Sequence, residues 1–158
     1  MANVGEPAGE HIGAELARVL DAAEIVLRRV SEEESGRPVL AGGWSRKQLL
    51  GHLIESASNN HQRFVRAALA DALEFPAYDT PGSVRVEAVE SAGWTMLGDL
   101  WASYNRYLVH VIRHLPAAKL DVVCRIGANA PVSLRYLVED YVRHLVYHLD
   151  QIGVETGR

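Results

Sequence analysis

The strongest helix signal in this chain is the stretch from Ser133 to Gly153, SLRYLVEDYVRHLVYHLDQIG. Its apolar residues return every three or four positions, the period of a helix that packs on one side. Ser133 suits an N-cap, and Gly153 suits the position just beyond a helix C-terminus. The pattern predicts a helix over 133–153, with this buried stripe: Leu134, Leu137, Val138, Tyr141, Leu145, Leu149 and Ile152.

Three further long segments carry the same helical period. The segments are residues 8–31, about 45–72, and 93–115. Ser45, with Gln48 three residues later, forms a capping box that predicts where the second of them begins. Pro116 ends the third, because proline cannot continue a helix. Four amphipathic helices in one small chain predict an all-α protein, a four-helix bundle formed by a single domain over residues 1–158.

The connections are expected to be short or irregular. Residues 31–38 are polar and acidic, and we interpret them as a solvated helix end and breaker. Residues 74–82 contain two prolines and a glycine, which predict a loop, and residues 83–90 allow a short extra helix. Residues 121–126 allow a short strand followed by a turn, so the connection before the last helix is irregular or contains a short strand.

The composition excludes several classes of protein. The net charge is −4 with a pI near 6.0 and no basic block, which argues against nucleic acid as a partner. No apolar run approaches the roughly 20 residues that span a bilayer, and the N-terminus lacks the pattern of a signal peptide. The single cysteine, Cys124, allows no internal disulfide and fits a cytoplasmic protein. We interpret Cys124 as a small core or loop residue rather than a nucleophile.

Two histidine pairs have the four-residue spacing that places both rings on one helix face. His110 and His114 fall about 140° and 100° from the centre of their helix's apolar stripe, and they are predicted to face solvent. His148 and His144 fall about 60° and 100° from theirs, so this pair borders the buried side. With a third histidine from another helix, this pair would provide three metal ligands and leave one position open.

The second helix carries a polar stripe of His52, Ser56, Asn59 and Arg63. His52 lies about 140° from the centre of the apolar side, so periodicity favours an exposed polar face. The alternative is that the stripe forms the polar wall of a pocket near one end of the bundle. His61 lies among apolar residues and is predicted to be a hydrogen-bonded core histidine. Periodicity does not choose between the two interpretations of His52.

Several motifs, in one order, resemble the DinB-like superfamily, especially its YfiT-like metal-dependent hydrolases. The resemblance covers about Trp44 to Ile152. The motifs are Trp44-Ser45-x-x-Gln48-x-x-Gly51-His52-Leu53, Asn59-x-x-x-Arg63-Phe64, Pro76-x-Tyr78-Asp79 and His144-x-x-x-His148-Leu149.

The resemblance implies a four-helix bundle, often dimeric, with three histidines on one divalent metal ion. It places the ligands at His52, His144 and His148, with nickel or zinc as the leading metals and manganese or iron as alternatives. Asn59 and Arg63 also match the YfiT-like pattern, whereas Tyr147 stands where many relatives carry a further histidine. The superfamily includes thiol-dependent S-transferases and isomerases as well, so the resemblance supports the metal site better than any substrate.

The leading hypothesis is a hydrolase in which three neutral imidazoles hold a metal that activates water. Asp140, one turn before His144, is a candidate partner of an imidazole or of the metal, with a solvated ion pair to Arg143 as the alternative. Glu55 is a candidate catalytic base. Arg63 is a candidate site for an anionic substrate group, with a structural ion pair as the alternative.

Further predictions complete the sequence-based hypothesis. Asn59, Arg63 and Tyr147 are the candidate residues for binding a cofactor or a small-molecule substrate, and Tyr136 is expected to flank the same stripe. The runner-up function is an S-transferase using a low-molecular-weight thiol, and the third is a non-catalytic metal-binding or interaction domain. A homodimer is expected, because the third long helix keeps Trp94 and other large residues beyond the needs of one core.

Overall fold

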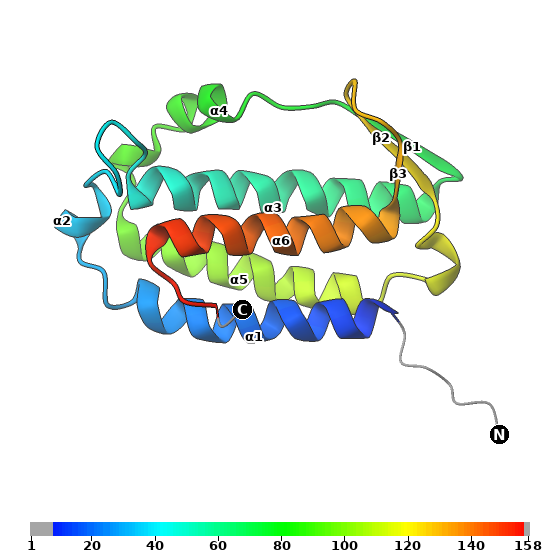
Figure 1. Cartoon of the computed structure of the whole chain (residues 1–158), viewed down its shortest axis with the longest axis horizontal. Coiled ribbons are helices and arrows are strands. Elements are labelled where there is room, and N and C mark those ends of the chain that lie inside the picture. Colours follow the sequence, from blue (N-terminus) through cyan, green and yellow to red (C-terminus); the bar gives the residue numbers. More distant parts are fainter. Residues whose placement is uncertain (1–7, 157–158) are drawn as a thin grey trace.

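The computed structural model describes residues 8–156, in which four long helices pack around one apolar interior (Figure 1). The four-helix bundle predicted from periodicity is confirmed. Helices α1 and α3 each contact both α5 and α6, so α1 and α3 lie on opposite corners of the bundle. Figure 1 shows α1 and α6 running in one direction and α3 and α5 in the other. The long helices are α1 (Ala8–Leu27), α3 (Arg46–Leu69), α5 (Trp94–Arg113) and α6 (Leu134–Ile152).

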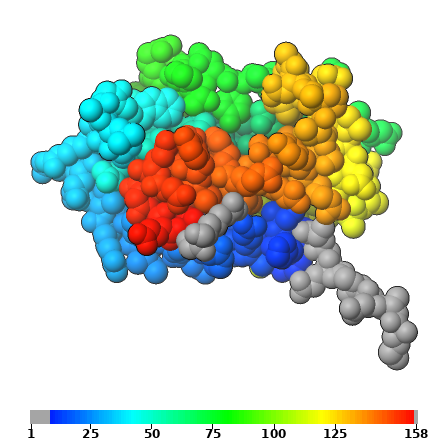
Figure 2. Space-filling model, in the orientation of Figure 1, coloured from blue at the N-terminus to red at the C-terminus, as the bar shows by residue number. Residues whose placement is uncertain are grey.

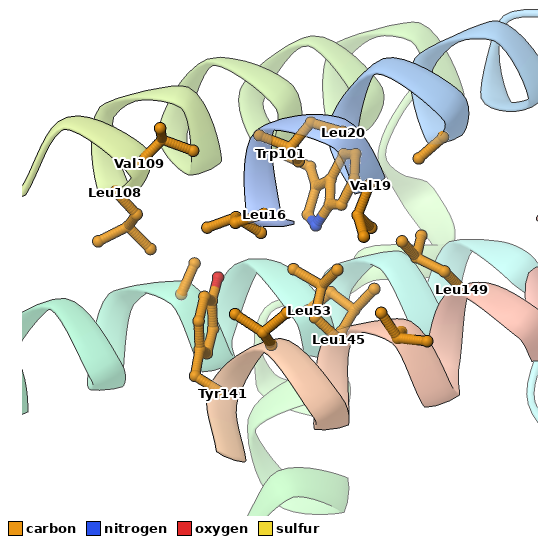
Figure 3. Packing of buried hydrophobic residues seen from close by; sticks show 14 of the residues in the cluster. Leu16, Val19, Leu20, Leu53, Trp101, Leu108, Val109, Tyr141, Leu145 and Leu149 are labelled. Atoms are coloured by element: carbon orange, nitrogen blue, oxygen red, sulfur yellow. The ribbon is translucent and has the colours of Figure 1, made fainter. Parts of the chain in front are cut away.

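The interior is filled by one apolar stripe from each long helix (Figure 3). Trp101 of α5 is fully buried and points toward Leu16 of α1, with Leu53 of α3 and Leu145 of α6 on the facing side. Burying one large aliphatic side chain contributes roughly 1.5–3 kcal/mol, so these stripes hold the four helices together. They fix how α3 and α6 face each other.

The connection from α1 to α3 differs from the expected solvated helix end. Helix α1 stops at Leu27, whose carbonyl oxygen accepts a hydrogen bond of 3.0 Å from Nε1 of Trp94. The acidic run forms a one-turn helix, α2 (Glu32–Ser35), with its own capping box. Glu32 accepts hydrogen bonds from the Trp94 backbone N–H (2.8 Å) and from Lys47. These partners are distant in sequence, which is why local composition indicated only a breaker.

A long crossover joins α3 to α5 and contains β1 (Ala72–Phe75), α4 (Thr80–Val86) and the 3-10 turn η1 (Val89–Ser91). The expected extension of α3 to residue 72 is wrong, because Ala70 is extended and its carbonyl oxygen accepts from Nζ of Lys119 at 2.8 Å. The predicted loop over 74–82 holds part of a strand, and the helical piece expected over 83–90 is divided between α4 and η1. The crossover passes along the outer side of α3 (Figures 1 and 2).

A three-stranded sheet closes one end of the bundle, in the order β1-β2-β3. After the 3-10 turn η2 (Ala117–Lys119) come β2 (Val123–Ile126), in the segment predicted to be extended, and β3 (Val132–Ser133). Strand β2 pairs in parallel with β1 and antiparallel with β3. Cys124 is buried in this sheet, and burial raises the pKa of its thiol, as expected for a structural residue. Of the helices described, none has the length and hydropathy of a membrane span.

Candidate metal centre

Helices α3 and α6 are antiparallel neighbours, and their contact brings together residues more than 90 positions apart. At the end of the pair, Nε of Arg46 in the first turn of α3 donates to the carbonyl oxygen of Ile152 at 3.0 Å. His52 lies less than two turns into α3, and His144 and His148 lie in the C-terminal half of α6. The antiparallel packing therefore places all three rings at one level of the bundle.

The three imidazoles converge on one point. Nε2 of His144 lies 3.1 Å from Nε2 of His52 and 3.1 Å from Nε2 of His148. One ligand atom from each ring lies within 4.8 Å of the other two. Nitrogens bound to one zinc or nickel ion at about 2.1 Å are roughly 3–3.5 Å apart, so both 3.1 Å separations fit a shared ion. The ring planes cross at 80–88°, which lets each nitrogen approach from its own direction.

Burial keeps the rings of His52 and His144 in the neutral form that binds a cation. Burial, with smaller contributions from the neighbouring His144 and His148, lowers the pKa of His52 to about 4. Burial also lowers the pKa of His144 to about 4, with a contribution from His148, whereas Asp140 acts in the opposite direction. Both rings are therefore neutral at physiological pH, the form in which imidazole binds a metal.

Gln151 determines which nitrogen of His148 faces the cluster. Its Oε1 lies 2.7 Å from Nδ1 of His148, and since an amide oxygen only accepts, Nδ1 must donate. Neutral His148 then carries its lone pair on Nε2, which points at His144. Nε2 of Gln151 donates to the hydroxyl of Tyr147 at 3.4 Å, which orients the amide. The sequence interpretation missed Gln151; its signal is the three-residue spacing from His148.

Glu55 occupies the corresponding place beside His52. Its Oε2 lies 3.8 Å from Nδ1 of His52, beyond hydrogen-bond distance, and both atoms are buried without a partner. The ring of Trp44 meets that of His52 edge-on at 5.9 Å and covers it. His52 is only 4% exposed. A carboxylate that close to a buried imidazole N–H is positioned to orient the ring.

The surroundings of Glu55 connect it to the crossover. Burial raises the pKa of Glu55, a hydrogen bond from Ser83 of α4 lowers it, and the charges of Glu87 and Asp79 raise it. Asp79 is the N-cap of α4 and accepts from the Gly82 N–H at 3.1 Å. The crossover therefore supplies the outer wall of the candidate site on the α3 side.

The remaining polar residues of the α3 stripe lie farther along the helix from the imidazoles. Ser56 is 1% exposed and hydrogen-bonds Tyr78 of the crossover. Asn59 donates from Nδ2 to the Glu55 carbonyl oxygen at 3.1 Å. Arg63 is buried between the rings of Phe75 and Tyr78, each 5.3 Å from its Cζ. The binding roles of Asn59 and Arg63 remain predictions.

Two candidates on α6 face outward. Nη2 of Arg143 lies 3.2 Å from Oδ1 of Asp140, whose side chain is 52% exposed, so the expected alternative of an ion pair is present. Tyr147 is 60% exposed and contacts the His148 ring at 5.0 Å. Tyr136 is also exposed and lies under Arg143. The catalytic role of Asp140 and the binding role of Tyr147 remain predictions.

Of the two interpretations of the His52 stripe, the exposed polar face that periodicity favoured is wrong. His52 and Ser56 are buried, because α6 and the crossover cover that face of α3 as a second packing surface. The other histidines agree with the sequence interpretation. His110 and His114 are exposed, and His61 is half-buried and hydrogen-bonds the hydroxyl of Tyr104 at 3.0 Å.

Comparison with known proteins agrees with the four-helix fold. The sequence profile of the DinB superfamily matches residues 15–152. This chain belongs to the DinB superfamily. Among solved structures, the DinB fold described here is similar to YfiT from Bacillus subtilis, with a TM-score of 0.81 and 17% identity over 96% of this chain and 87% of that one. YfiT is described as a probable metal-dependent hydrolase with an unusual four-helix bundle topology. A search of curated protein sequences finds no significant match.

Proposed function

We propose that this DinB protein is a hydrolase that depends on one divalent metal ion held by His52, His144 and His148. The convergence of three buried or half-buried imidazole nitrogens carries the proposal. Three neutral ligands leave the ion its full charge and leave a coordination position for substrate or water. When bound, such an ion lowers the pKa of a coordinated water toward neutrality and polarises an acyl or phosphoryl oxygen. Nickel and zinc are the proposed metals.

The chain's own residues prepare the site for this chemistry. Gln151 holds His148 with Nε2 toward the cluster, and the carboxylate of Glu55 lies 3.8 Å from Nδ1 of His52, where its charge orients the ring. Trp44 excludes water from the buried side of His52, whereas His144 and His148 keep partial exposure on the α6 side. The exposed side of the cluster therefore lies at α6, beside Asp140. On this side we propose Asp140 as the group that accepts a proton from the attacking water, because it is an exposed carboxylate one helical turn before His144.

Metal analysis after reconstitution tests the proposal. We expect one equivalent of nickel or zinc per chain in the wild-type protein and a loss of at least about 100-fold in affinity in His52→Ala, His144→Ala and His148→Ala. His110→Ala is the matched control, because it removes a histidine from the exposed four-residue pair on α5. Wild-type protein that binds less than one equivalent, or His144→Ala protein that keeps full occupancy, would contradict the proposal.

The reaction class needs a separate assay. Metal-loaded protein is screened against ester, amide and phosphoester substrates with and without low-molecular-weight thiols. Thiol-independent hydrolysis that is lost in His144→Ala supports the hydrolase. Turnover that requires a thiol assigns the S-transferase alternative, and a metal-loaded protein with no turnover and no exchangeable coordination position assigns the non-catalytic domain.

The homodimer also remains a proposal. The sequence argument from Trp94 does not support it, because that residue is buried within its own chain. The exposed large side chains of α5 are Met96, Leu100 and Tyr107, which provide an alternative apolar surface. Sedimentation of Leu100→Glu beside wild-type protein tests whether that surface joins two copies.

A further inference from the structure

Arg63 is a buried cation without a counter-charge. The residue is 8% exposed, and the rings of Phe75 and Tyr78 lie 5.3 Å from its Cζ. Its Nε is buried and has no hydrogen-bond partner. None of the ion pairs found within residues 8–156 involves Arg63. The aromatic rings cover the guanidinium without neutralising it.

This arrangement is unfavourable unless something else pairs with the charge. Transfer of an ion from water into a protein interior costs several kcal/mol, and natural interiors normally offset that cost with an opposite charge and hydrogen bonds. Burial accordingly lowers the pKa of Arg63, although a guanidinium stays protonated in proteins. An ordinary structural arginine would be paired, as Arg106 is with Asp21 and Glu24. Arg63 is therefore suited to pair with an anion from outside the described chain.

Arg63 also belongs to the polar stripe of α3 that contains His52. Tyr78, which stacks on Arg63, hydrogen-bonds Ser56, and Ser56 is four residues beyond His52 on α3. His52 and Arg63 are about 16 Å apart along the helix axis, about three turns, and both side chains lean toward the N-terminus of α3. A ligand that spans about this distance would reach both the histidine cluster and the cation.

We propose that Arg63 binds an oxyanion, a carboxylate or phosphate group, at the end of the substrate remote from the reacting bond. The planar guanidinium matches such a group bidentately. Phe75 and Tyr78 would enclose the charged pair and exclude water from it. The substrate class is thus an acid whose hydrolysable bond lies about three helical turns, roughly 16 Å, from its anionic group. The position of the hydrolysable bond at the histidine cluster rests on the proposed function, whereas the binding of an oxyanion by Arg63 does not.

Arg66 provides a matched control on the same helix. Its Cζ lies 5.9 Å from the ring of Phe75, but the residue is exposed and its Nε donates to Gln62 at 3.2 Å. If Arg63 only anchors the crossover through its aromatic contacts, both arginines are structural and neither affects anion binding.

The experiment titrates metal-free protein with inorganic phosphate and, separately, with acetate at constant ionic strength, using calorimetry. We expect saturable millimolar binding of at least one of the two anions to wild-type protein and to Arg66→Met. Arg63→Met should bind at least about tenfold more weakly, the loss expected for a charge-assisted pair. Equal binding by folded Arg63→Met, or no binding to wild-type protein, overturns the proposal. A preference between the two anions distinguishes a phosphate from a carboxylate substrate.

A second measurement remains valid if Arg63→Met does not fold. In wild-type protein, the Arg63 Nε–H signal should shift on addition of the binding anion but not with chloride, and an unchanged signal overturns the proposal. Both measurements use metal-free protein, so failure of the metal proposal leaves them unaffected. In the loaded enzyme, Arg63→Met should raise KM about tenfold for an ester with a remote carboxylate but not for its neutral analogue.

Discussion

Nδ1 of His148 lies 2.7 Å from Oε1 of Gln151, and this one contact directs the ring's other nitrogen at the metal centre. The Gln151 amide is itself oriented by the Tyr147 hydroxyl. The centre therefore depends on residues beyond the three histidines, on both helices that form it.

Replacing Gln151 tests how far this contact sets metal affinity. We expect Gln151→Ala to weaken zinc or nickel binding about 10- to 100-fold, the usual effect of losing a hydrogen bond that orients a ligand. Tyr147→Phe removes only the hydroxyl behind Gln151 and should cost less than Gln151→Ala. Competition with a chromophoric chelator gives both affinities. Unchanged affinity in Gln151→Ala would show that His148 needs no orienting partner.

Replacing Glu55 should affect the metal-free and metal-loaded protein in opposite directions. Burial raises the pKa of Glu55, so its ionised form destabilises the metal-free fold at neutral pH. Glu55→Gln removes that charge and should stabilise the metal-free protein in urea. The same variant should bind metal about 10- to 100-fold more weakly, because the charged carboxylate attracts the Nδ1 proton of His52 more strongly than a neutral amide does.

The outcome for Glu55 separates two roles. If Glu55 is instead the catalytic base, Glu55→Gln keeps wild-type metal affinity and loses turnover. Asp140→Asn is the comparison, since it removes a carboxylate on the exposed side of the cluster without altering a contact of His52.

A glycine next to the site has a steric function. A Cβ at Gly51 would lie 2.6 and 2.7 Å from the two methyl groups of Val89, a short buried side chain that has little room to move. Gly51→Ala should lower the free energy of unfolding by about 1–3 kcal/mol and displace His52 from the cluster.

A Cβ at Gly98, inside α5, would meet nothing within 4 Å. Gly98→Ala should therefore stabilise the protein by about 0.5–1 kcal/mol. Urea unfolding of both variants measures the contrast, and equal effects would contradict it.

The sequence predicts those features of the fold that depend on residues close together in the chain. The apolar stripes of α1 and α6 and the capping box at Ser45 mark the long helices, because each depends on residues within a few turns. The end of α1 at Leu27 depends on Trp94, and β1 depends on pairing with β2, about 50 residues later. These contacts leave no local pattern.

The candidate site shows the same division. The spacing of His144 and His148 predicts that their rings share a face, which needs only one helix. The burial of His52 depends on the crossover and α6, so the helical wheel of α3 alone favoured solvent exposure and did not decide between the two interpretations. The family motif, which reflects the whole fold, selected His52 as a ligand. Gln151 and the pairing of Arg143 with Asp140 are side-chain choices that spacing permits but does not require.

The stability of the metal-free protein should fall as the pH is lowered from about 6.5 to about 4. The pKa of His52 and of His144 is about 4 in the folded protein and ordinarily 6.5, so the unfolded chain takes up these protons first. Their contribution to stability is therefore fully present above pH 6.5 and is lost as the pH falls toward 4. Asp140 raises the pKa of His144, but burial and His148 outweigh it.

Urea unfolding in a chelator-containing buffer at pH 7.5, 5.5 and 4 measures this loss. His144→Leu removes one of the two titrating rings, so its stability should fall less over this interval than that of wild-type protein, by on the order of 1–2 kcal/mol. His110→Gln, which removes an exposed ring, should follow the wild-type curve. If His144→Leu and wild-type protein lose stability in parallel, His52 and His144 do not meet as neutral rings, and the metal proposal loses its electrostatic basis.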